Sequence, residues 1–378
     1  MKLLMNIVIA CLRFIYFFMK LMPVKHKVVM ISRQANQPSV DFILLKEALY
    51  RRDPTLKIKL LCRTLDGGIQ SKLSSKIKYS FHMLKQMKEI ASSEVVVLDS
   101  YCIVISLLHH RKSLKIIQMW HSIGSMKKFG YTALDTAEGT KKDVAKMMHM
   151  HENYSFVFAS SPAYQGDLAK GFHCDESIVR IFPLPRIDLL TDEHYRELKR
   201  NEIFDRYPEW KHHKIIAYCP TFRKEENEMQ AAVDSLCDAL YDNQILVVKL
   251  HPLSKIKLTD SKAYFASEFS SFDILFAADA VISDYSCIVY EAALLNIPLY
   301  FYNFDMYKYS EGRGLAIDYE HELPGLISKN PNEITAAIHQ GEYDIKALQQ
   351  FCNRYVYRNG NASDNMASFI LKTAKGAG

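Results

Sequence analysis

The sequence lacks the short motifs that mark metal-dependent and redox enzymes. It contains no C-x-x-C pair, no D-x-D and no H-E-x-x-H motif. Its eight cysteines stand at positions 11, 62, 102, 174, 219, 237, 287 and 352, several of them inside apolar runs where buried free thiols are common. These absences argue against a structural zinc and against a catalytic metal, and they favour a reducing compartment. We therefore expect no metal and no cofactor.

Tandem repeats, low-complexity tracts and a long linker are also missing. With 378 residues, the chain exceeds the size at which a single hydrophobic core normally stops growing. Hydrophobic residues make up 49% and charged residues 24%, which is typical of a folded protein. The sequence therefore predicts two closely coupled domains.

Acidic residues are scarce at the start of the chain. Residues 1–90 hold 17 Lys and Arg against 5 Asp and Glu, a balance of +12, so the rest must carry −6 to give the formal total of +6. One end of the molecule is thus expected to face an anionic partner. Since no RNA-binding signature or base-stacking motif is present, that partner is not expected to be a nucleic acid.

Residues 3–19 are almost entirely apolar, but a narrow polar stripe interrupts them. Lys2, Asn6, Arg13 and Lys20 fall within about 40° of one another on a helical projection. This pattern favours a helix that lies in an anionic bilayer interface. Two alternatives stay open: a membrane-spanning anchor, with Arg13 costing about 3 kcal/mol near the centre, and a helix packed on its own protein. No cleavage site of the small-x-small type follows, which disfavours a signal peptide.

Short apolar runs alternate with helical patterns along the chain. Strands are predicted at 28–32, 58–62, 95–99, 115–120 and 156–160, and then at 214–220, 245–252, 280–284 and 298–302, with helices near 39–52, 80–91, 141–150 and 162–170. Two βαβ series of similar size predict an α/β fold with two Rossmann-like, doubly wound domains that face each other across a cleft. The expected boundaries are a membrane helix at 1–22, domains at 23–192 and 193–355, and a C-terminal helix at 356–378 that can return to the first domain.

Polar residues follow the strands of the second half directly. They are Thr221 and Arg223, then His251, and then Asp284 with Ser286. Ligands bind outside the carboxyl ends of such strands. Asp284 or Ser286 can cap the next helix, whose first N–H groups would suit a phosphate. Micromolar binding needs about 8 kcal/mol, more than a helix dipole of about 1 kcal/mol supplies, so several of these groups must act together.

Each of these residues also has a simpler structural interpretation. A Ser or Asp after a strand is more often only a helix cap. A lone His is more often a structural residue whose hydrogen bonds are made within the protein. Their joint placement is what favours a binding site. We interpret the histidines at 109, 110, 212 and 213 as surface residues.

The stretch QMWHSIGSMKKFGY at 118–131 predicts a second part of the site. Lys127 and Lys128 can hold phosphates, while Gly124 and Gly130 allow the backbone to turn close to them. A solvated basic loop is the alternative.

Six segments of the chain together resemble one family. They are WHSIGSMKKFGY, YCPTFR, VKLHP, VISDYSCIVYEAALLNIPLYFYNFDMYKY, RGLAIDYEHELPGLI and YRNGNASDNMASFI. Their order and spacing over about residues 115–370 are similar to those of the CDP-glycerol glycerophosphotransferases, the teichoic acid primases and polymerases. The ISDYS-helix block is the most specific part of this resemblance.

The resemblance implies a GT-B fold and monotopic attachment to the cytoplasmic face of the membrane. It also implies transfer of a polyol phosphate, usually glycerol 3-phosphate, from a CDP-alcohol to a hydroxyl of a lipid-linked acceptor, with release of CMP. The acceptor would be a polyprenyl-diphosphate-linked saccharide or a polyol phosphate, and the product a cell-surface polymer.

The resemblance also implies roles for individual residues. His121 matches the catalytic base, a task for which a histidine with a pKa near 6.5 is suited. His251 matches the histidine that meets the donor pyrophosphate. The other positions that the resemblance and the strand-end pattern assign to the donor are Thr221, Arg223, Asp284, Ser286, Cys287 and Glu291, the last near the ribose; Lys127, Lys128 and Arg186 are assigned to acceptor or donor phosphates.

Three positions depart from the family pattern. The chain has Ser122-Ile123-Gly124 where polymerases usually have G-T-P, Cys287 in place of a second serine, and PLPR in place of GxPR. The first departure leaves primase and polymerase both open. A backbone N–H at Cys287 can still serve a phosphate.

Other functions compete with this interpretation. CDP-ribitol is an alternative donor within the same family. A sugar-nucleotide glycosyltransferase or 2-epimerase would share the fold, but would have no use for His121. A non-enzymatic basic scaffold fits only the N-terminal charge.

Overall fold

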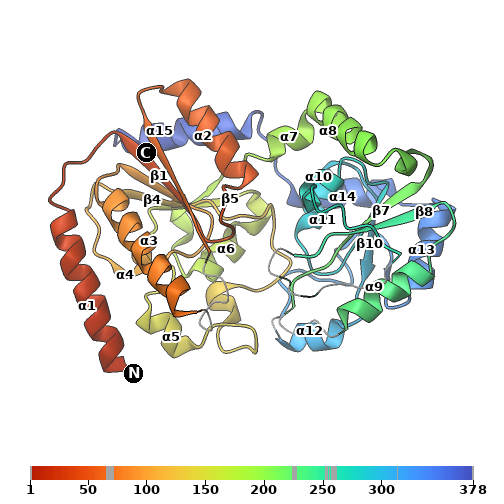
Figure 1. Ribbon diagram of the computed structural model, residues 1–378, viewed down its shortest axis with the longest axis horizontal. Coiled ribbons are helices and arrows are strands. Elements are labelled where there is room, and N and C mark those ends of the chain that lie inside the picture. The colour runs from red at the N-terminus through yellow and green to blue at the C-terminus, as the bar shows by residue number, and fades with distance from the viewer. Residues whose placement is uncertain are drawn as a thin grey trace. The chain divides into compact units, whose positions relative to one another are not determined.

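The computed structural model describes residues 2–64, 72–223, 228–251, 254, 256, 262–312 and 314–376. The chain divides into two compact units (Figure 1). Unit 1 comprises residues 1–121, 129–188 and 358–378, and unit 2 comprises residues 122–128 and 189–357. One segment differs from the expected boundaries, since residues 122–128 belong to the second unit. The C-terminal segment belongs to the first unit, the return that the sequence analysis allowed.

Unit 1 is built on a six-stranded parallel sheet with the order β2-β1-β3-β4-β5-β6. The strands are β1 (Lys27–Ser32), β2 (Lys57–Cys62), β3 (Val95–Leu98), β4 (Lys115–Gln118), β5 (Phe156–Ala159) and β6 (Val179–Ile181). The first five were predicted, because β-branched residues such as Val28, Val29 and Val96 form continuous buried runs. Strand β6 was not predicted, because its three residues are too few to show the hydrophobic pattern of a strand.

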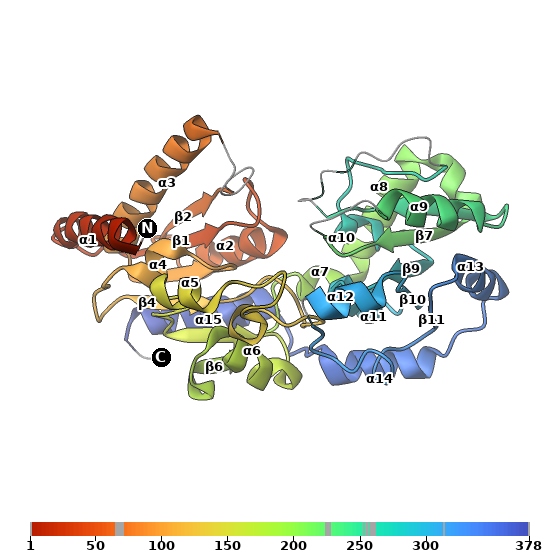
Figure 2. The same cartoon turned by 90° about the horizontal axis from the view of Figure 1, so that it is seen from below.

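Helices cover both faces of this sheet (Figures 1 and 2). They are α1 (Lys2–Met19), α2 (Val40–Arg52), α3 (Leu73–Ala91), α4 (Ile103–Leu107), α5 (Lys142–Met147), α6 (Gln165–Phe172) and α15 (Ala362–Ala374). Ser39 caps α2 by accepting a hydrogen bond from the Phe42 N–H.

Helix α1 packs on unit 1 beside α3, and two residues of its polar stripe, Arg13 and Lys20, contact the protein. Arg13 Nε donates to the Leu107 carbonyl at 2.8 Å, and Lys20 Nζ donates to the His109 carbonyl at 2.7 Å. Tyr16 is buried, and its hydroxyl lies 2.8 Å from His110 Nδ1. His110 is therefore not a surface residue as expected, and burial lowers its pKa to about 4.

No helix in the described part of the chain is both long enough and apolar enough to cross a membrane.

Unit 2 contains a five-stranded parallel sheet with the order β11-β10-β9-β7-β8. The strands are β7 (Lys214–Cys219), β8 (Gln244–Val248), β9 (Ala280–Ser283), β10 (Leu299–Tyr302) and β11 (Ile327–Ser328). Its helices are α8 (Glu193–Arg206), α9 (Met229–Asp238), α10 (Ser271–Ile274), α11 (Ile288–Leu294), α12 (Met306–Gly312), α13 (Pro331–Gln340) and α14 (Ile345–Tyr355), and the short α7 (Ile187–Thr191) contains the passage from unit 1.

The C-terminal helix α15 is anchored to unit 1 by a half-buried carboxylate. Asp188 accepts hydrogen bonds from the backbone N–H of Ala362 at 2.7 Å and of Ser363 at 2.9 Å, and from the Ser363 hydroxyl at 2.5 Å. The body of the helix packs against α2. These N–H groups have no acceptor inside their own helix, so the Asp188 carboxylate supplies the acceptor that the start of the helix needs.

We predict that Asp188→Ala lowers the free energy of unfolding by about 2–3 kcal/mol, because charge-assisted hydrogen bonds are lost from buried N–H groups. Urea titration followed by circular dichroism measures this loss. The matched control is Asp192→Ala, which removes the exposed N-cap of α8 and should cost about 1 kcal/mol. Equal losses in the two variants would contradict the anchoring role of Asp188.

Candidate functional site

The polar residues of unit 2 that were predicted from strand ends lie at one edge of its sheet. Strands β8, β7 and β9 are consecutive neighbours, and all three run parallel. Their carboxyl ends therefore lead to His251, to Thr221 and to Asp284. His251 is exposed, with its ring 5.6 Å from that of Phe222.

Arg223 and Asp284 form a buried ion-pair network with Asp305. Arg223 Nη2 lies 2.8 Å from Asp284 Oδ2 and 2.9 Å from Asp305 Oδ1, and Arg223 Nε lies 2.5 Å from Asp305 Oδ2. Arg223 Nη1 donates to the Thr221 carbonyl at 2.7 Å. Tyr285 and Tyr309 stack beside the guanidinium, with ring centroids 4.0 Å apart. The network thus ties β7, β9 and the segment after β10 together.

This network encloses two residues that were assigned to the donor. The Asp284 side chain is 0% exposed, and its carboxylate accepts from the backbone N–H of Thr221 and of Tyr285 as well as from Arg223. Arg223 and Asp284 thus position Thr221 and the start of α11. Their contacts with a donor stay predictions. Asp305 was not predicted, although it follows β10 as the other site residues follow their strands.

Thr221 has one polar atom that the protein does not use. Its backbone N–H and carbonyl are bonded to Asp284 and Arg223, but its buried Oγ1 has no partner among the described residues. A buried hydroxyl without a partner is uncommon and costs about 1–3 kcal/mol. Its predicted contact with the donor therefore stays a prediction.

The start of α11 is only weakly capped. Asp284 does not cap this helix as expected, and the Ser286 hydroxyl accepts from the Ile288 N–H at a long 3.5 Å. Ser286 and Cys287 are partly exposed, whereas Glu291 lies buried one turn further along. A donor phosphate at Ser286 and Cys287 and a ribose near Glu291 stay predictions.

Residues 122–128, which we term the crossing segment, pack against α11 within unit 2. The Cys287 thiol lies 3.3 Å from the Gly124 carbonyl, and the Tyr290 hydroxyl lies 3.3 Å from Met126 Sδ. Lys127 forms an antiparallel bridge with Leu315. Burial raises the pKa of the Cys287 thiol, while the nearby Lys127 ammonium acts to lower it. Lys127 therefore lies beside the start of α11.

Lys128 and the two glycines of the opening stretch differ in their surroundings. Lys128 is exposed, and its N–H donates to the Gly314 carbonyl at 3.2 Å. Gly130 has a φ of +55°, and a Cβ there would lie 2.1 Å from the Gly171 carbonyl oxygen. The absence of a side chain at Gly130 thus allows its backbone to approach that of Gly171 closely. Gly124, in contrast, does not have a positive φ.

His121 follows β4 in unit 1, and its ring is oriented by a backbone carbonyl. His121 Nδ1 lies 2.9 Å from the Asp99 carbonyl oxygen, and Asp99 follows the neighbouring strand β3. The amide nitrogen of Gln34 lies farther from the same ring nitrogen, at 3.3 Å. Because the nearer partner is a carbonyl oxygen, which can only accept, we assign the hydrogen to Nδ1. The neutral ring then has its lone pair on Nε2, which is the form that a general base needs.

Arg186 supports His121. Its Nε lies 3.0 Å from Asp41 Oδ2, its Nη2 contacts the same oxygen, and Nη2 also donates to the His121 carbonyl at 3.2 Å. Asp41 is buried and accepts from the Arg186 backbone N–H as well. Arg186 thus positions His121, and its predicted role in phosphate binding stays a prediction.

Trp120, directly before His121, adopts a left-handed backbone conformation with a φ of 63°. Such a value is rare for a bulky residue and persists only when the surroundings impose it. The buried Gln118 does so, because its Oε1 accepts from the Trp120 N–H at 3.1 Å. Gln118 begins the stretch 118–131 that was predicted to be part of the site, but no role was predicted for it. Asp99 was not indicated, although it directly follows a strand.

His121 and His251 belong to different units, so their predicted meeting at one diphosphate stays a prediction.

Comparison with known proteins agrees with these features. The sequence profile of the family CDP-Glycerol:Poly(glycerophosphate) glycerophosphotransferase matches residues 14–372. The chain is 30% identical over 371 residues to the teichoic acid ribitol-phosphate primase of Bacillus spizizenii, covering 93% of this chain and 92% of that one. It is 31% identical over 301 residues to the teichoic acid glycerol-phosphate primase of Bacillus subtilis, covering 78% and 77%.

Among solved structures, the wall teichoic acid polymerase TagF superimposes with a TM-score of 0.77 at 20% identity, covering 98% of this chain and 95% of that one. The parallel sheets and this likeness place the protein in the GT-B-like class of α/β folds. The chain belongs to the CDP-glycerol:poly(glycerophosphate) glycerophosphotransferase family, the polyol-phosphate transferases of teichoic acid synthesis.

The buried Asp99 beside His121 gives a pH-dependent prediction. Burial raises the pKa of Asp99 to about 6, against the lowering effect of the Ser32 and Ser100 hydroxyls. A carboxyl whose pKa is higher in the folded state stabilises the fold below its unfolded pKa of about 3.9, and this contribution is lost as the pH rises through about 6.

We therefore expect Asp99→Asn, which cannot titrate, to gain stability relative to the wild type between about pH 4 and pH 6, by about 2–3 kcal/mol. Urea unfolding of both proteins at pH 4, 5, 6 and 7 measures the difference. A difference that stays constant over this range would show that Asp99 ionises normally in the folded protein.

Proposed function

We propose that this protein transfers glycerol 3-phosphate from CDP-glycerol to a hydroxyl of a membrane lipid-linked acceptor. The acceptor oxygen forms a bond to the phosphorus that bears the glycerol, the bond from this phosphorus to the bridging oxygen breaks, and CMP leaves with that oxygen. The hydrogen bond from His121 Nδ1 to the Asp99 carbonyl carries the proposal, because it leaves Nε2 as the proton acceptor for the attacking hydroxyl.

The donor side of the proposal rests on unit 2. Thr221 Oγ1, the Lys127 ammonium beside the start of α11, and the exposed His251 offer hydrogen bonds and positive charge for a diphosphate. Such donors stabilise the charge that develops on the departing phosphate. Ser286 and the Cys287 N–H complete the proposed donor site. No metal enters this mechanism.

CDP-ribitol is the second candidate donor. The similarity to a ribitol-phosphate primase extends over nearly the whole of both chains. This similarity favours CDP-ribitol as the second donor. Since both similarities above, which cover at least three quarters of each chain, are to primases, we propose a single addition rather than polymerisation. Mass analysis of the lipid-linked product after incubation with each donor identifies the polyol and the number of additions.

Two substitutions test the proposed chemistry separately. His121→Asn should lower kcat by about 10²–10⁴-fold while donor affinity is unchanged, because only the proton acceptor is lost. Thr221→Val should weaken donor binding severalfold without lowering stability, because Oγ1 makes no hydrogen bond within the described protein.

CMP release with lipid acceptor gives kcat, and calorimetric titration with CDP-glycerol and CDP-ribitol gives affinity. Full activity of a folded His121→Asn protein would overturn the assignment of the base. Absence of CMP with both donors would overturn the donor class.

We also propose that unit 1 binds the cytoplasmic face of the membrane as a peripheral protein. With Arg13 and Lys20 bonded to unit 1, α1 directs apolar side chains outward, and Phe14 is 66% exposed. The neighbouring α3 adds a stripe at Leu73, Ile77 and Phe81, four residues apart. Large exposed apolar patches of this kind mark interaction surfaces.

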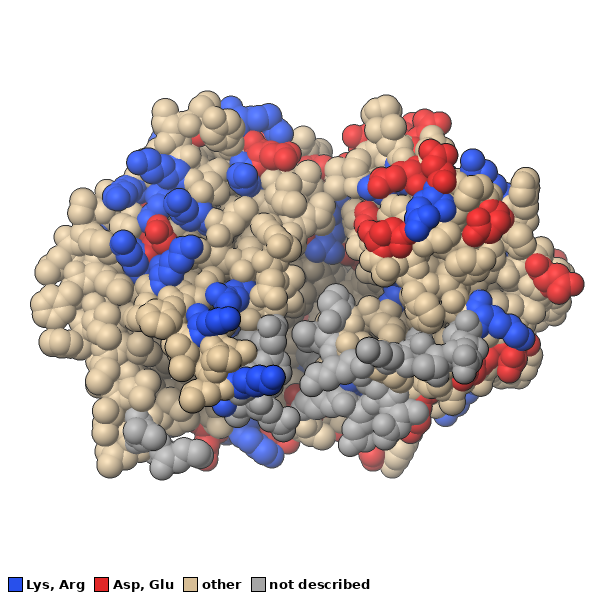
Figure 3. All heavy atoms as spheres, viewed as in Figure 1, with Lys and Arg blue, Asp and Glu red and all other residues tan. Residues whose placement is uncertain are grey.

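Positive charge lies close to these apolar side chains. Figure 3 shows Lys and Arg gathered over the region of α2 and α3, next to the mainly uncharged surface of α1. Exposed lysines of α3 and its start are Lys72, Lys76 and Lys78. Each contributes about 1 kcal/mol near anionic lipid.

We expect the double substitution Phe14→Glu and Phe81→Glu to abolish co-sedimentation with phosphatidylglycerol vesicles at unchanged thermal stability, because both side chains already face water in the free protein. Leu198→Glu, at an exposed apolar position of α8 in unit 2, is the matched control and should retain binding. Equal binding by the double variant and the wild type would place the membrane surface elsewhere.

A further inference from the structure

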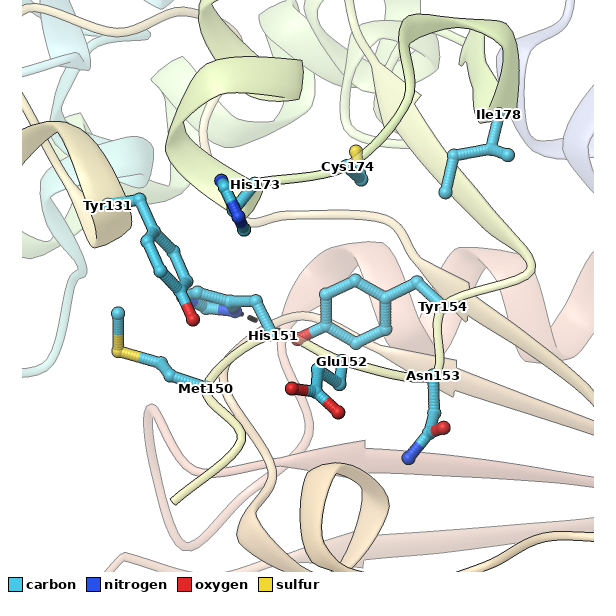
Figure 4. A pocket seen from close by; sticks show the side chains of 9 residues that line it. All are labelled: Tyr131, Met150, His151, Glu152, Asn153, Tyr154, His173, Cys174 and Ile178. Carbon is cyan, nitrogen blue, oxygen red and sulfur yellow. Dashed lines mark hydrogen bonds between the residues drawn. The ribbon is translucent and has the colours of Figure 1, made fainter. Parts of the chain in front are cut away.

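Unit 1 contains a pocket that the proposed reaction does not use. Its volume is about 260 Å³, slightly below the range of about 300–1,000 Å³ typical of small-molecule sites. Figure 4 shows the side chains around it, which come from the turn η2 (Gly130–Ala133), the segment before β5 and the segment after α6. The lining residues are Tyr131, Met150, His151, Glu152, Asn153, Tyr154, His173, Cys174 and Ile178.

A chain of hydrogen bonds begins beside His121 and leads toward this pocket. The Trp120 N–H donates to Gln118 Oε1, so the amide orientation of Gln118 is fixed and its Nε2 must donate. Gln118 Nε2 lies 3.3 Å from the Tyr154 hydroxyl oxygen and 3.2 Å from the Ser100 carbonyl. The Tyr154 oxygen thus accepts a hydrogen bond from Gln118.

The last step of this chain determines which nitrogen of His151 carries a hydrogen. Burial raises the pKa of Tyr154, so its hydroxyl keeps its proton. Its remaining partner is His151 Nδ1 at 3.0 Å, to which it donates. Burial also lowers the pKa of His151 to about 4, so the ring is neutral near pH 7. A neutral ring that accepts at Nδ1 presents an N–H at Nε2.

This Nε2–H donor has no partner within the described protein. His151 is only 8% exposed, and its recorded polar contact is the one at Nδ1. The neighbouring Gly130 leaves room beside it, since a Cβ there would lie 3.4 Å from Nε2. Nε2 is not one of the fully enclosed atoms without a partner, so it is open to the pocket, where a ligand or a water can accept from it.

The charges around the pocket disfavour a phosphate. None of its nine lining residues is a lysine or arginine, and Glu152 contributes a carboxylate. Glu152 Oε2 is paired with His149 Nδ1 at 2.9 Å, which leaves Oε1 as a possible acceptor. An anionic ligand would meet this carboxylate without a fixed positive charge to offset it. A neutral ligand with hydroxyl groups satisfies both the His151 donor and the Glu152 acceptor.

Flat aromatic surfaces favour a ring over a linear polyol. Tyr131 stacks on His173 with ring centroids 4.4 Å apart and an interplanar angle of 19°, and Tyr154 forms another side of the pocket (Figure 4). The C–H groups on one face of a pyranose pack well against such rings, whereas a flexible chain must lose more rotational freedom to do so.

We propose that this pocket is a binding site for a single neutral sugar ring. His151 Nε2 donates to a sugar oxygen, Glu152 accepts from a hydroxyl, and Tyr131 packs against the face of the ring. The site is separate from the proposed CDP-alcohol site, and its occupancy is measurable without any transferase activity.

Saturation-transfer difference NMR on the full chain tests this proposal, with N-acetylglucosamine as the probe and ribitol and inorganic phosphate for comparison. We expect saturation of N-acetylglucosamine with a Kd of about 1–10 mM, as befits one small ligand with few contacts. Ribitol should bind at least severalfold more weakly. Neither inorganic phosphate nor CDP should displace the sugar.

Two variants connect the signal to the pocket. His151→Asn keeps a residue that tolerates the left-handed backbone at φ 64° but removes the Nε2 donor, and it should weaken binding about tenfold. Tyr131→Leu removes the aromatic face at a partly exposed position and should weaken binding similarly if His151→Asn fails to fold. His109→Asn, at an exposed histidine of the same unit, is the control and should bind as the wild type does.

Absence of saturation transfer from N-acetylglucosamine to the wild type would overturn the proposal. So would unchanged binding in folded His151→Asn and Tyr131→Leu proteins, or displacement of the sugar by CDP or phosphate.

Discussion

The account of this protein depends on one hydrogen bond, from His121 Nδ1 to the backbone carbonyl of Asp99. Strands β3 and β4 are parallel neighbours, with Leu98 paired to Gln118, so the residues that follow them emerge at the same edge of the sheet. The tautomer of His121 is thereby set by strand register. Because the acceptor belongs to the backbone, substitution of the Asp99 side chain leaves it in place. The proton acceptor at Nε2 is a consequence of the fold itself.

Around this bond, buried polar groups support the backbone of the site. Arg186 and Asp41 hold the His121 carbonyl, and Gln118 holds Trp120 in its unusual conformation. In unit 2 the enclosed pair of Arg223 and Asp284 likewise holds the backbone of Thr221 and Tyr285 in place. Removing one partner of such a pair leaves an uncompensated charge and typically costs about 3–5 kcal/mol. Charged residues after a strand can therefore belong to a site without touching what binds there.

The sequence predicted the strands and the family well, because continuous buried runs and the ISDYS block are strong local signals. It missed β6 and β11, which have three and two residues. It also could not place residues 122–128, since Ile123 and Met126 are equally apolar whichever core they join. Nor could it separate Thr221, with an unused hydroxyl, from Asp284, which is enclosed. That distinction depends on Asp305, a partner distant in the chain.

The tautomeric state of His121 tests the central claim most directly. Long-range ¹H–¹⁵N correlation spectra of protein labelled at histidine nitrogens distinguish the two neutral forms, and His121→Asn assigns the signal. The account predicts a protonated Nδ1 and an unprotonated Nε2 for His121 above the pKa of its ring. A protonated Nε2 with an unprotonated Nδ1 would contradict it, because the ring would then have no lone pair at Nε2 to receive the acceptor's proton.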